Sequence, residues 1–443
     1  MASGLQVMLL LLFPILALSD VGVNWGRIAN DLPEPPQVVR LLKSQGINRV
    51  KIFDTNPSVL TALAHSNISI VVAMPNELLS QAAAAQSFTD AWVRSNISPH
   101  VPATNIISIA VGNEVFVDPN NTTEFLVPAM KNLYASLTQF KLSHIKISSP
   151  IALSCLATSY PTSSGSFKPD LVETAIKPML DFLRTTASPL MLNVYPFFAY
   201  TANSDTISLD YALLRDNKGV LDQGSGLTYT SLFDAQIDAV FAAMKALQYD
   251  DVKISVTETG WPSIGDENEI GAGHENAAAY NGNLVRRVLT GTGTPMNPNQ
   301  PLDVYLFALF NENQKSGPTS ERNYGLFYPN QQKVYDISLK GTDSAPPAAA
   351  GQTWCVASDQ ASEDKLREAM NYACGEGGAD CRPIQEEGST CHNPDSLIAQ
   401  ASYAFNSYYQ KKARATGTCD FGGAAYVITQ QPRFGNCDFP SGY

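Results

Sequence analysis

Charged side chains are scarce in this chain of 443 residues. Asp, Glu, Lys and Arg make up 16% of it, where about a quarter is usual in soluble proteins, and the formal net charge is -12. Binding of nucleic acid or anionic lipid depends on clustered positive charge, so the composition argues against both partners. A neutral partner rich in hydroxyl groups fits better.

Motifs for metal, nucleotide and serine-hydrolase chemistry are absent too. The five histidines, at positions 65, 100, 144, 274 and 392, show no metal-ligand spacing, and neither HExxH nor a paired CxxC occurs. The GxSxG signature of serine hydrolases is missing, and no GxGxxG follows the first strand-like run. The sequence therefore predicts no metal and no cofactor.

Cysteine is nearly absent from the first 350 residues, where Cys155 stands alone and is expected to be a buried thiol. An even number of cysteines gathered in the remaining short segment of an exported chain predicts disulfides rather than a metal site. Six cysteines allow fifteen pairings, and their order does not choose among them. These six are Cys355, Cys374, Cys381, Cys391, Cys419 and Cys437.

Long apolar runs are missing except near the N-terminus. Residues 7–18 are apolar, and Ala17 and Ser19 have the spacing of a signal-peptidase site, so we predict a secretory signal over residues 1–19. An N-terminal anchor is the alternative, but a run of about a dozen residues is short for a bilayer. We expect a mature chain that is secreted and has no membrane span. Sequons for N-glycosylation occur at Asn67, Asn96, Asn120 and Asn121.

A stretch of Pro, Ala, Gly and small polar residues at 341–353 interrupts the patterned sequence. We predict a large domain over residues 20–340, a linker over 341–353 and a small disulfide-rich module over 354–443.

The large domain contains eight short apolar runs rich in β-branched residues, separated by stretches with helical spacing. Near-continuous apolar strands that alternate with helices indicate a parallel sheet covered on both faces. Eight such units predict an α/β fold of the (β/α)8 barrel type, and a doubly wound open sheet is the alternative. The runs are residues 21–26, 49–54, 68–75, 106–114, 144–150, 190–196, 252–258 and 304–312.

Three glutamates stand at the ends of these predicted strands, namely Glu114, Glu258 and Glu312. Active sites of such barrels form at the carboxyl ends of the strands. A single glutamate there is about as often an ion-pair partner or a helix cap, so each residue alone proves little. Two carboxyl groups facing each other across a barrel mouth are, however, what glycoside hydrolysis requires.

Polar and aromatic residues near these glutamates suit a sugar ligand. Asn113 can hydrogen-bond a sugar hydroxyl, and Tyr195, Phe198 and Trp261 offer flat apolar faces, although each aromatic side chain alone is more often part of a core.

The motifs of both domains resemble known families. The segments VGVNWGRIANDLP, AVGNEV, MLNVYPFFAY, SVTETGWPS and LFNENQKSGPTSERNYGLFYP resemble plant glycoside hydrolase family 17, the endo-β-1,3-glucanases. The C-terminal segments TWCVA, NYACGEGGADC, ASYAFNSYYQ and CDFGGAAYV resemble carbohydrate-binding module family 43, also called the X8 domain.

This resemblance implies roles for particular residues. Glu114 would be the general acid and base, Glu258 the nucleophile, and Glu312, Lys315 and Glu321 supporting residues, with a cation keeping the nucleophile ionised. Trp25, where many relatives have tyrosine, would lie in the probable cleft.

For the C-terminal module, the resemblance implies disulfides Cys355–Cys419, Cys374–Cys437 and Cys381–Cys391, and binding of β-1,3-glucan. The alternative for the module is a cap that only solubilises the enzyme. The aromatic residues Tyr403, Phe405, Tyr408 and Tyr409 follow a helical pattern that favours core packing over sugar contact.

The expected function is that of a secreted, retaining endo-hydrolase of β-1,3-glucan, located outside the cell or in the cell wall and acting as a monomer. Two alternatives remain open: a non-catalytic glucan-binding wall protein, and a hydrolase of mixed-linkage β-1,3;1,4-glucan.

Overall fold

The structure is a computed structural model that divides into two compact units, one up to residue 341 and one from residue 342. It describes residues 21–339, 353–358, 361–386, 389, 391–392, 396–412, 414–415, 417–428, 431–432, 434 and 437–441. The expected signal at 1–19 and all but the last residue of the expected linker lie outside these ranges.

The first unit is built on a nine-stranded sheet in which every neighbouring pair is parallel, in the order β5-β4-β3-β2-β1-β13-β12-β9-β6. Its strands are β1 (Val21–Asn24), β2 (Arg49–Lys51), β3 (Ser69–Met74), β4 (Asn105–Val111), β5 (Lys146–Ser148), β6 (Pro150–Ala152), β9 (Leu190–Asn193), β12 (Ile254–Thr259) and β13 (Val304–Leu306).

The two ends of this sheet are joined by the chain itself. Strands β5 and β6 are separated only by Ser149, and β5 pairs with β4 while β6 pairs with β9. The segment 146–152 therefore closes the ring, and all eight predicted strand runs contain barrel strands. The prediction of a (β/α)8 barrel is confirmed.

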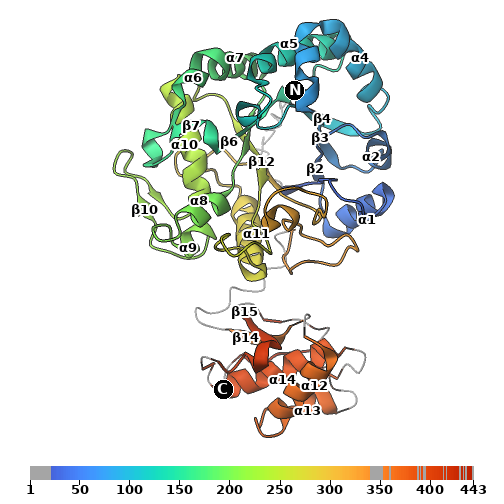
Figure 1. Ribbon diagram of the computed structural model, residues 1–443, viewed down its shortest axis with the longest axis vertical. Helices are drawn as coiled ribbons and strands as arrows, with labels where there is room; N and C mark the ends of the chain where they lie inside the picture. Colours follow the sequence, from blue (N-terminus) through green and yellow to red (C-terminus); the bar gives the residue numbers. More distant parts are fainter. Residues whose placement is uncertain are drawn as a thin grey trace, which may run out of the picture. The chain divides into compact units, whose positions relative to one another are not determined.

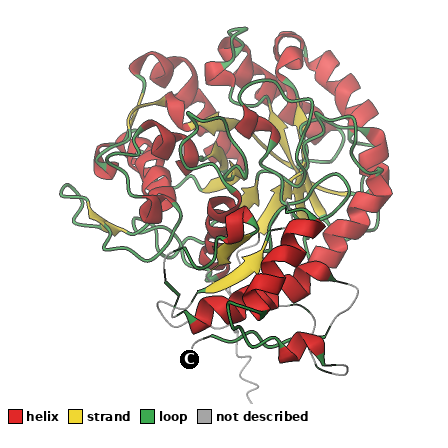
Figure 2. Cartoon of the chain, turned by 60° about the horizontal axis from the view of Figure 1, so that its bottom comes forward, coloured by secondary structure: helices red, strands yellow, loops and turns green. Residues whose placement is uncertain are grey.

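Helices surround the strands (Figure 1), which form the inner layer in Figure 2. In α5, the apolar residues Leu126, Met130, Leu133 and Leu137 recur on one face and are buried, because that face packs against the sheet. The α-helices of this unit are α1 (Pro35–Gln45), α2 (Pro57–Ala62), α3 (Leu79–Ala84), α4 (Gln86–Asn96), α5 (Thr123–Gln139), α6 (Pro169–Leu171), α7 (Lys177–Thr186), α8 (Pro196–Ala202), α9 (Leu209–Ala212), α10 (Leu232–Ala246) and α11 (His274–Leu289).

Shorter elements decorate the loops. They are the π-helix η5 (Val172–Ile176), the 3-10 helices η1 (Asn76–Leu78), η2 (Val115–Val117), η3 (Leu153–Cys155), η4 (Thr162–Ser164) and η6 (Thr319–Arg322), and the strand pairs β7 (Leu156–Thr158) with β8 (Ser166–Phe167) and β10 (Val220–Leu221) with β11 (Thr228–Tyr229).

A small cluster of buried residues from four strands packs separately from the main core. It consists of Val71, Ala73, Ala110, Met191 and Tyr305, from β3, β4, β9 and β13. Such a cluster is the interior layer that fills a barrel of this kind, so any reactive groups are confined to the strand ends above it.

The second unit packs two antiparallel strands, β14 (Trp354–Ala357) and β15 (Ala425–Ile428), against helices. Its helices are α12 (Glu363–Cys374), α13 (Arg382–Gln385), α14 (Leu397–Lys411) and the 3-10 helix η7 (Phe421–Gly423). Tyr403, Phe405 and Tyr409 of α14 are buried in its core and Tyr408 is half-buried, as the helical pattern predicted.

All six C-terminal cysteines form disulfides, but two of the three expected pairings are wrong. Cys355–Cys419 occurs as expected, whereas the other two bonds are Cys374–Cys381 and Cys391–Cys437, not Cys374–Cys437 and Cys381–Cys391. The reason is a tight turn after α12: the N–H of Gly377 bonds to Tyr372 and that of Ala379 to Ala373. This turn folds the chain back and brings Cys381 beside Cys374. Cys155 is buried and free.

The pairing can be tested by proteolysis without reduction, followed by mass spectrometry of the linked peptides. We expect a peptide joining Cys374 to Cys381, and a peptide joining Cys374 to Cys437 would contradict the structure. Replacing Cys374 and Cys381 by serine should cost about 2 kcal/mol less than replacing Cys355 and Cys419, because the bridged separations are 7 and 64 residues and loop entropy grows with length.

Candidate active site

Two of the strand-end glutamates lie together at the barrel mouth. Glu258 belongs to β12, where it neighbours Asn193 of β9, and Glu114 follows β4. The negative charge of Glu258 raises the pKa of Glu114, so the two carboxyl groups share one electrostatic environment. Residues 144 positions apart in the sequence are therefore brought into one site by parallel strands that end at the same rim.

Both oxygens of Glu258 have partners. The Nζ of Lys51 lies 2.5 Å from Oε1, and the hydroxyl of Tyr195 donates to Oε2 at 3.0 Å. Lys51 has only 1% of its side chain exposed and also lies over the ring of Phe53, 4.4 Å from its centroid. A cation and a hydroxyl donor in a buried setting stabilise the ionised form of Glu258.

Glu114 is held differently. Its Oε1 accepts a hydrogen bond from Nδ2 of Asn193 at 2.9 Å, and Oδ1 of Asn193 accepts from the hydroxyl of Thr257 at 3.0 Å, which fixes the amide orientation. Burial is the main cause that raises the pKa of Glu114, and the charge of Glu258 adds to it. One carboxyl group is thus favoured in its protonated form beside another that is paired with a cation, which is the division that acid and nucleophile roles require.

The remaining expected residues form a neighbouring group. Glu312 is buried, which raises its pKa, and it accepts the backbone N–H of Ile28 at 2.8 Å. A Cβ on Gly26 would lie 2.3 Å from its Oε2, so only glycine leaves room for this carboxylate. Lys315 pairs with Glu321 at 3.3 Å.

The cation bonded to Glu258 is therefore Lys51. The family resemblance pointed to Lys315 as a cation near the carboxylates, and Lys315 does pair with Glu321 and lowers the pKa of Glu312, but it is not the cation bonded to Glu258. Lys51 was missed although a signal was present, since a lysine inside the apolar run RVKIFD needs a buried partner. Asn193, which ends the run LMLN, was missed as a partner of Glu114.

The aromatic residues divide into exposed and buried ones. Phe198 is 48% exposed and packs against Tyr195, with ring centroids 5.4 Å apart. Trp25 and Trp261, by contrast, have only 2% and 0% exposure, so neither Trp261, expected to offer a face to a sugar, nor Trp25, expected in the cleft, is open to a ligand. Trp261 donates its indole N–H to the carbonyl of Gly271 at 2.8 Å and supports the loop behind Glu258.

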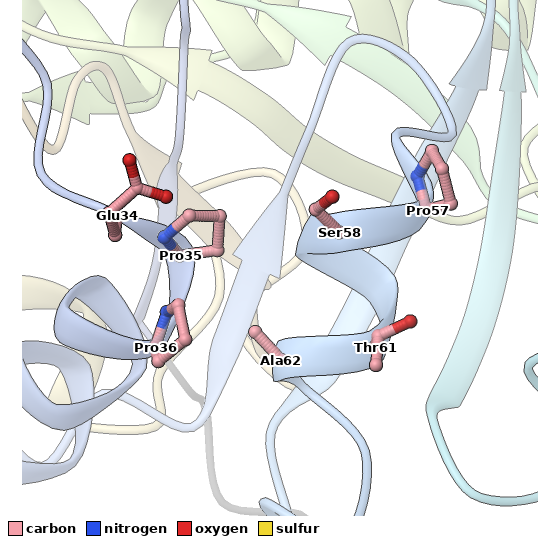
Figure 3. A pocket seen from close by; sticks show the side chains of 7 residues that line it. All are labelled: Glu34, Pro35, Pro36, Pro57, Ser58, Thr61 and Ala62. Atoms are coloured by element: carbon pink, nitrogen blue, oxygen red, sulfur yellow. The ribbon is translucent and has the colours of Figure 1, made fainter.

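One cavity in the described part of the chain adjoins these groups, and another lies between helices. The first, of about 240 Å³, is lined by Lys51, Phe53, Ala73, Pro75, Asn76, Glu77, Ala110, Gly112 and Asn113, and so reaches the partner of Glu258. The other, of about 410 Å³, lies between the start of α1 and the length of α2 (Figure 3), and its only titratable side chain, Glu34, caps α1. The smaller cavity is the one connected to the reactive groups.

Nothing in the described part of the chain suggests a metal centre, since no group of three or more His, Cys, Asp or Glu side chains there could hold an ion. The arrangement offers proton transfer and nucleophilic attack by carboxyl groups.

Sequence comparisons place both units. The family described as Glycosyl hydrolases family 17 matches residues 21–339, and the X8 domain matches residues 353–426. Glucan endo-1,3-beta-glucosidase 13 of Arabidopsis thaliana is 40% identical over 440 residues, which cover 97% of this chain and 87% of the relative. Glucan endo-1,3-beta-D-glucosidase of Olea europaea is 38% identical over 462 residues, and the match covers 100% of both chains.

Solved structures agree. A β-1,3-glucanase and allergen of Cryptomeria japonica pollen is 42% identical and superimposes with a TM-score of 0.70, over 72% of this chain and 99% of that one. One of two plant β-glucan endohydrolases with distinct substrate specificities is 38% identical, with a TM-score of 0.67 over the same shares of the two chains.

The buried pair Lys51–Glu258 predicts a particular pattern of stabilities. Lys51→Met should lower the free energy of unfolding by about 3 kcal/mol, because it leaves a buried carboxylate without its cation. The double variant Lys51→Met/Glu258→Gln should regain most of this loss, as measured by chemical denaturation.

Lys333→Met is the matched control, because Lys333 pairs with Asp336 at the surface and should change stability by less than about 1 kcal/mol. A Lys51→Met variant as stable as the wild type, or a double variant no better than the single one, would contradict this account of the pair.

Proposed function

The chain belongs to the glycosyl hydrolases family 17, carries an X8 domain and is a glycoside hydrolase, and from this premise we propose that it cleaves β-1,3-glucan within the polymer with retention of configuration. The observation that carries the proposal is the different setting of two carboxyl groups at one barrel mouth. Burial and a neighbouring charge raise the pKa of Glu114, whereas Glu258 is bonded to Lys51 and Tyr195.

In the first step, Glu114 donates its proton to the glycosidic oxygen as the bond breaks, and Glu258 attacks the anomeric carbon to form a glycosyl-enzyme. Glu114 is then ionised and takes a proton from water, which displaces Glu258 from the sugar. Negative charge leaves Glu258 in the first step and returns in the second, so Lys51 and Tyr195 stabilise the departing carboxylate.

The pKa of Glu114 also changes between the two steps of the reaction. While Glu258 is charged, its field adds to burial in raising the pKa of Glu114. Once Glu258 is esterified, that contribution is gone and Glu114 gives up its proton more readily. The residue is therefore an acid in the first step and a base in the second. Asn193 holds its carboxyl group in place throughout.

The choice of β-1,3-glucan rests on the relatives, whose names specify glucan endo-1,3-β-glucosidases across the whole length of the chain. Phe198 and Tyr195 give the mouth an aromatic surface suited to sugar rings. The X8 unit would bind the same polymer and keep the enzyme near an insoluble substrate through the connecting segment.

Secretion as a monomer completes the proposal, and no described helix is long and apolar enough to cross a membrane. Asn67, Asn120 and Asn121 are exposed and suited to carry glycans. Asn96 is less suited, because its Nδ2 donates to the carbonyl of Trp92 and its Oδ1 accepts from Thr55.

The test is product analysis on a linear β-1,3-glucan, with the anomeric configuration followed by NMR during the first turnovers. We expect short β-configured oligosaccharides from the wild type. The rate of hydrolysis should fall at least about 10³-fold in Glu258→Gln, and the rate on the polymer should fall by as much in Glu114→Gln. The matched control is Glu173→Gln, because Glu173 is paired with Lys177 at the outer surface and should leave turnover unchanged.

Each alternative has its own outcome. If the wild type binds the polymer without cleaving it, the alternative of a glucan-binding wall protein is supported. If it releases sugars faster from mixed-linkage β-1,3;1,4-glucan, that polymer is the substrate instead. Products of inverted configuration would refute the covalent intermediate.

A further inference from the structure

The backbone that presents Glu114 is unusual. Both Gly112 and Glu114 are in the left-handed region, with φ of 67° and 50°. For a residue with a side chain, that conformation costs roughly 1–2 kcal/mol and persists only where neighbouring groups hold it. The backbone N–H of Glu114 bonds to the carbonyl of Pro150 at 2.9 Å, which fixes one end of the turn.

A side chain from the segment that follows the neighbouring strand β3 fixes the other end. Asn76 begins η1, directly after β3, and its Oδ1 accepts the backbone N–H of Asn113 at 2.7 Å. Its Nδ2 donates to the backbone carbonyl of the same residue at 3.1 Å. One amide therefore satisfies both polar groups of the peptide residue that lies between the two left-handed positions.

Contact at this point is close. A Cβ on Gly112 would lie 2.8 Å from Oδ1 of Asn76 and 2.4 Å from Cγ2 of Val115. Glycine is thus required both for its φ and for the approach of the Asn76 amide. The amide also helps to lower the pKa of Asp118, after the larger effects of the Thr122 hydroxyl and the Asn120 backbone.

The turn also directs Asn113. Its side-chain oxygen is buried and has no hydrogen-bond partner among the described residues, and Asn76 and Asn113 line the same cavity of about 240 Å³. A rotation of this turn would move Asn113 and Glu114 together, because the two residues are consecutive.

We propose that Asn76 is a positioning residue that clamps the turn 112–114 and so aims the carboxyl group of Glu114 at the glycosidic oxygen. The inference rests on the proposed function, in which Glu114 is the acid. Asn76 itself touches neither proton nor reacting atom, and it acts through the backbone of Asn113.

The experiment compares two substrates that differ in their need for an acid. A β-1,3-glucan has a poor leaving group that must be protonated, whereas a dinitrophenyl β-1,3-oligoglucoside releases a phenolate that needs no proton. The value of kcat/KM reports the step that breaks this first bond. Asn76→Ala should lower kcat/KM on the polymer about 100-fold, the scale of a 1 Å misplacement, and on the aryl substrate by less than about fivefold.

Two variants sharpen the comparison. Asn76→Asp keeps the acceptor for the Asn113 N–H but replaces the donor to its carbonyl, so it should behave as Asn76→Ala does. Asn132→Ala is the matched control, since Nδ2 of Asn132 donates to the carbonyls of Ala82 and Ala83 at 2.8 and 3.0 Å on the outer helices. It should lower the melting temperature without changing either activity.

If Asn76→Ala lowers kcat/KM equally on both substrates, the proposal is overturned, because a general structural defect does not distinguish leaving groups. Unchanged cleavage of the polymer by Asn76→Ala would overturn it too. The proposed function is tested separately by Glu114→Gln, which must lose its activity on the polymer and retain kcat/KM on the aryl substrate. If Glu114→Gln still cleaves the polymer, Glu114 is not the acid and both proposals fall.

Discussion

The site depends on two buried carboxyl groups in different settings, Glu258 bonded to a buried lysine and Glu114 in surroundings that raise its pKa. Desolvation opposes charge on both, so their states can differ only if a specific partner favours ionisation of one. Lys51 is that partner for Glu258, and its position inside the barrel is itself tolerable only because Glu258 is there. Burial and the charge of Glu258 then act together on Glu114.

The barrel supplies this arrangement from separate strands. Lys51 comes from β2, Glu258 from β12, and Asn193 from β9 lies beside Glu258 and reaches Glu114 after β4. Parallel strands deliver all of these side chains to one rim, while small residues such as Ala73 and Ala110 fill the layer below. The C-terminal unit is stabilised differently, since its small core is supplemented by three disulfides.

Much of this was readable from the sequence because strand patterns are local. The eight apolar runs predicted the barrel, and the glutamates at their ends predicted where the candidate site lies. The partners of those glutamates were not readable in the same way. Lys51, Asn193 and Asn76 are ordinary polar residues until the fold sets them against Glu258, Glu114 and the turn before it.

The errors have physical causes as well. Trp25 and Trp261 were expected in the ligand cleft, but large rings near a barrel rim can equally be buried in the core, as both are, and Trp261 bonds to the loop behind Glu258. The disulfide pairing failed because it depends on the turn after α12, which brings Cys374 and Cys381 together. Neither outcome is fixed by the spacing of residues.

Trapping the intermediate on the enzyme tests the roles of Glu258 and Glu114 directly. A 2-deoxy-2-fluoro β-1,3-oligoglucoside with a dinitrophenyl leaving group forms the glycosyl-enzyme faster than water removes it, and peptide mass spectrometry then locates the label. One label is expected, on the carboxyl group of Glu258, which wild-type enzyme loses slowly on addition of an acceptor sugar. A label on Glu114, or turnover of β-1,3-glucan by an enzyme that never accumulates a label, would contradict these roles.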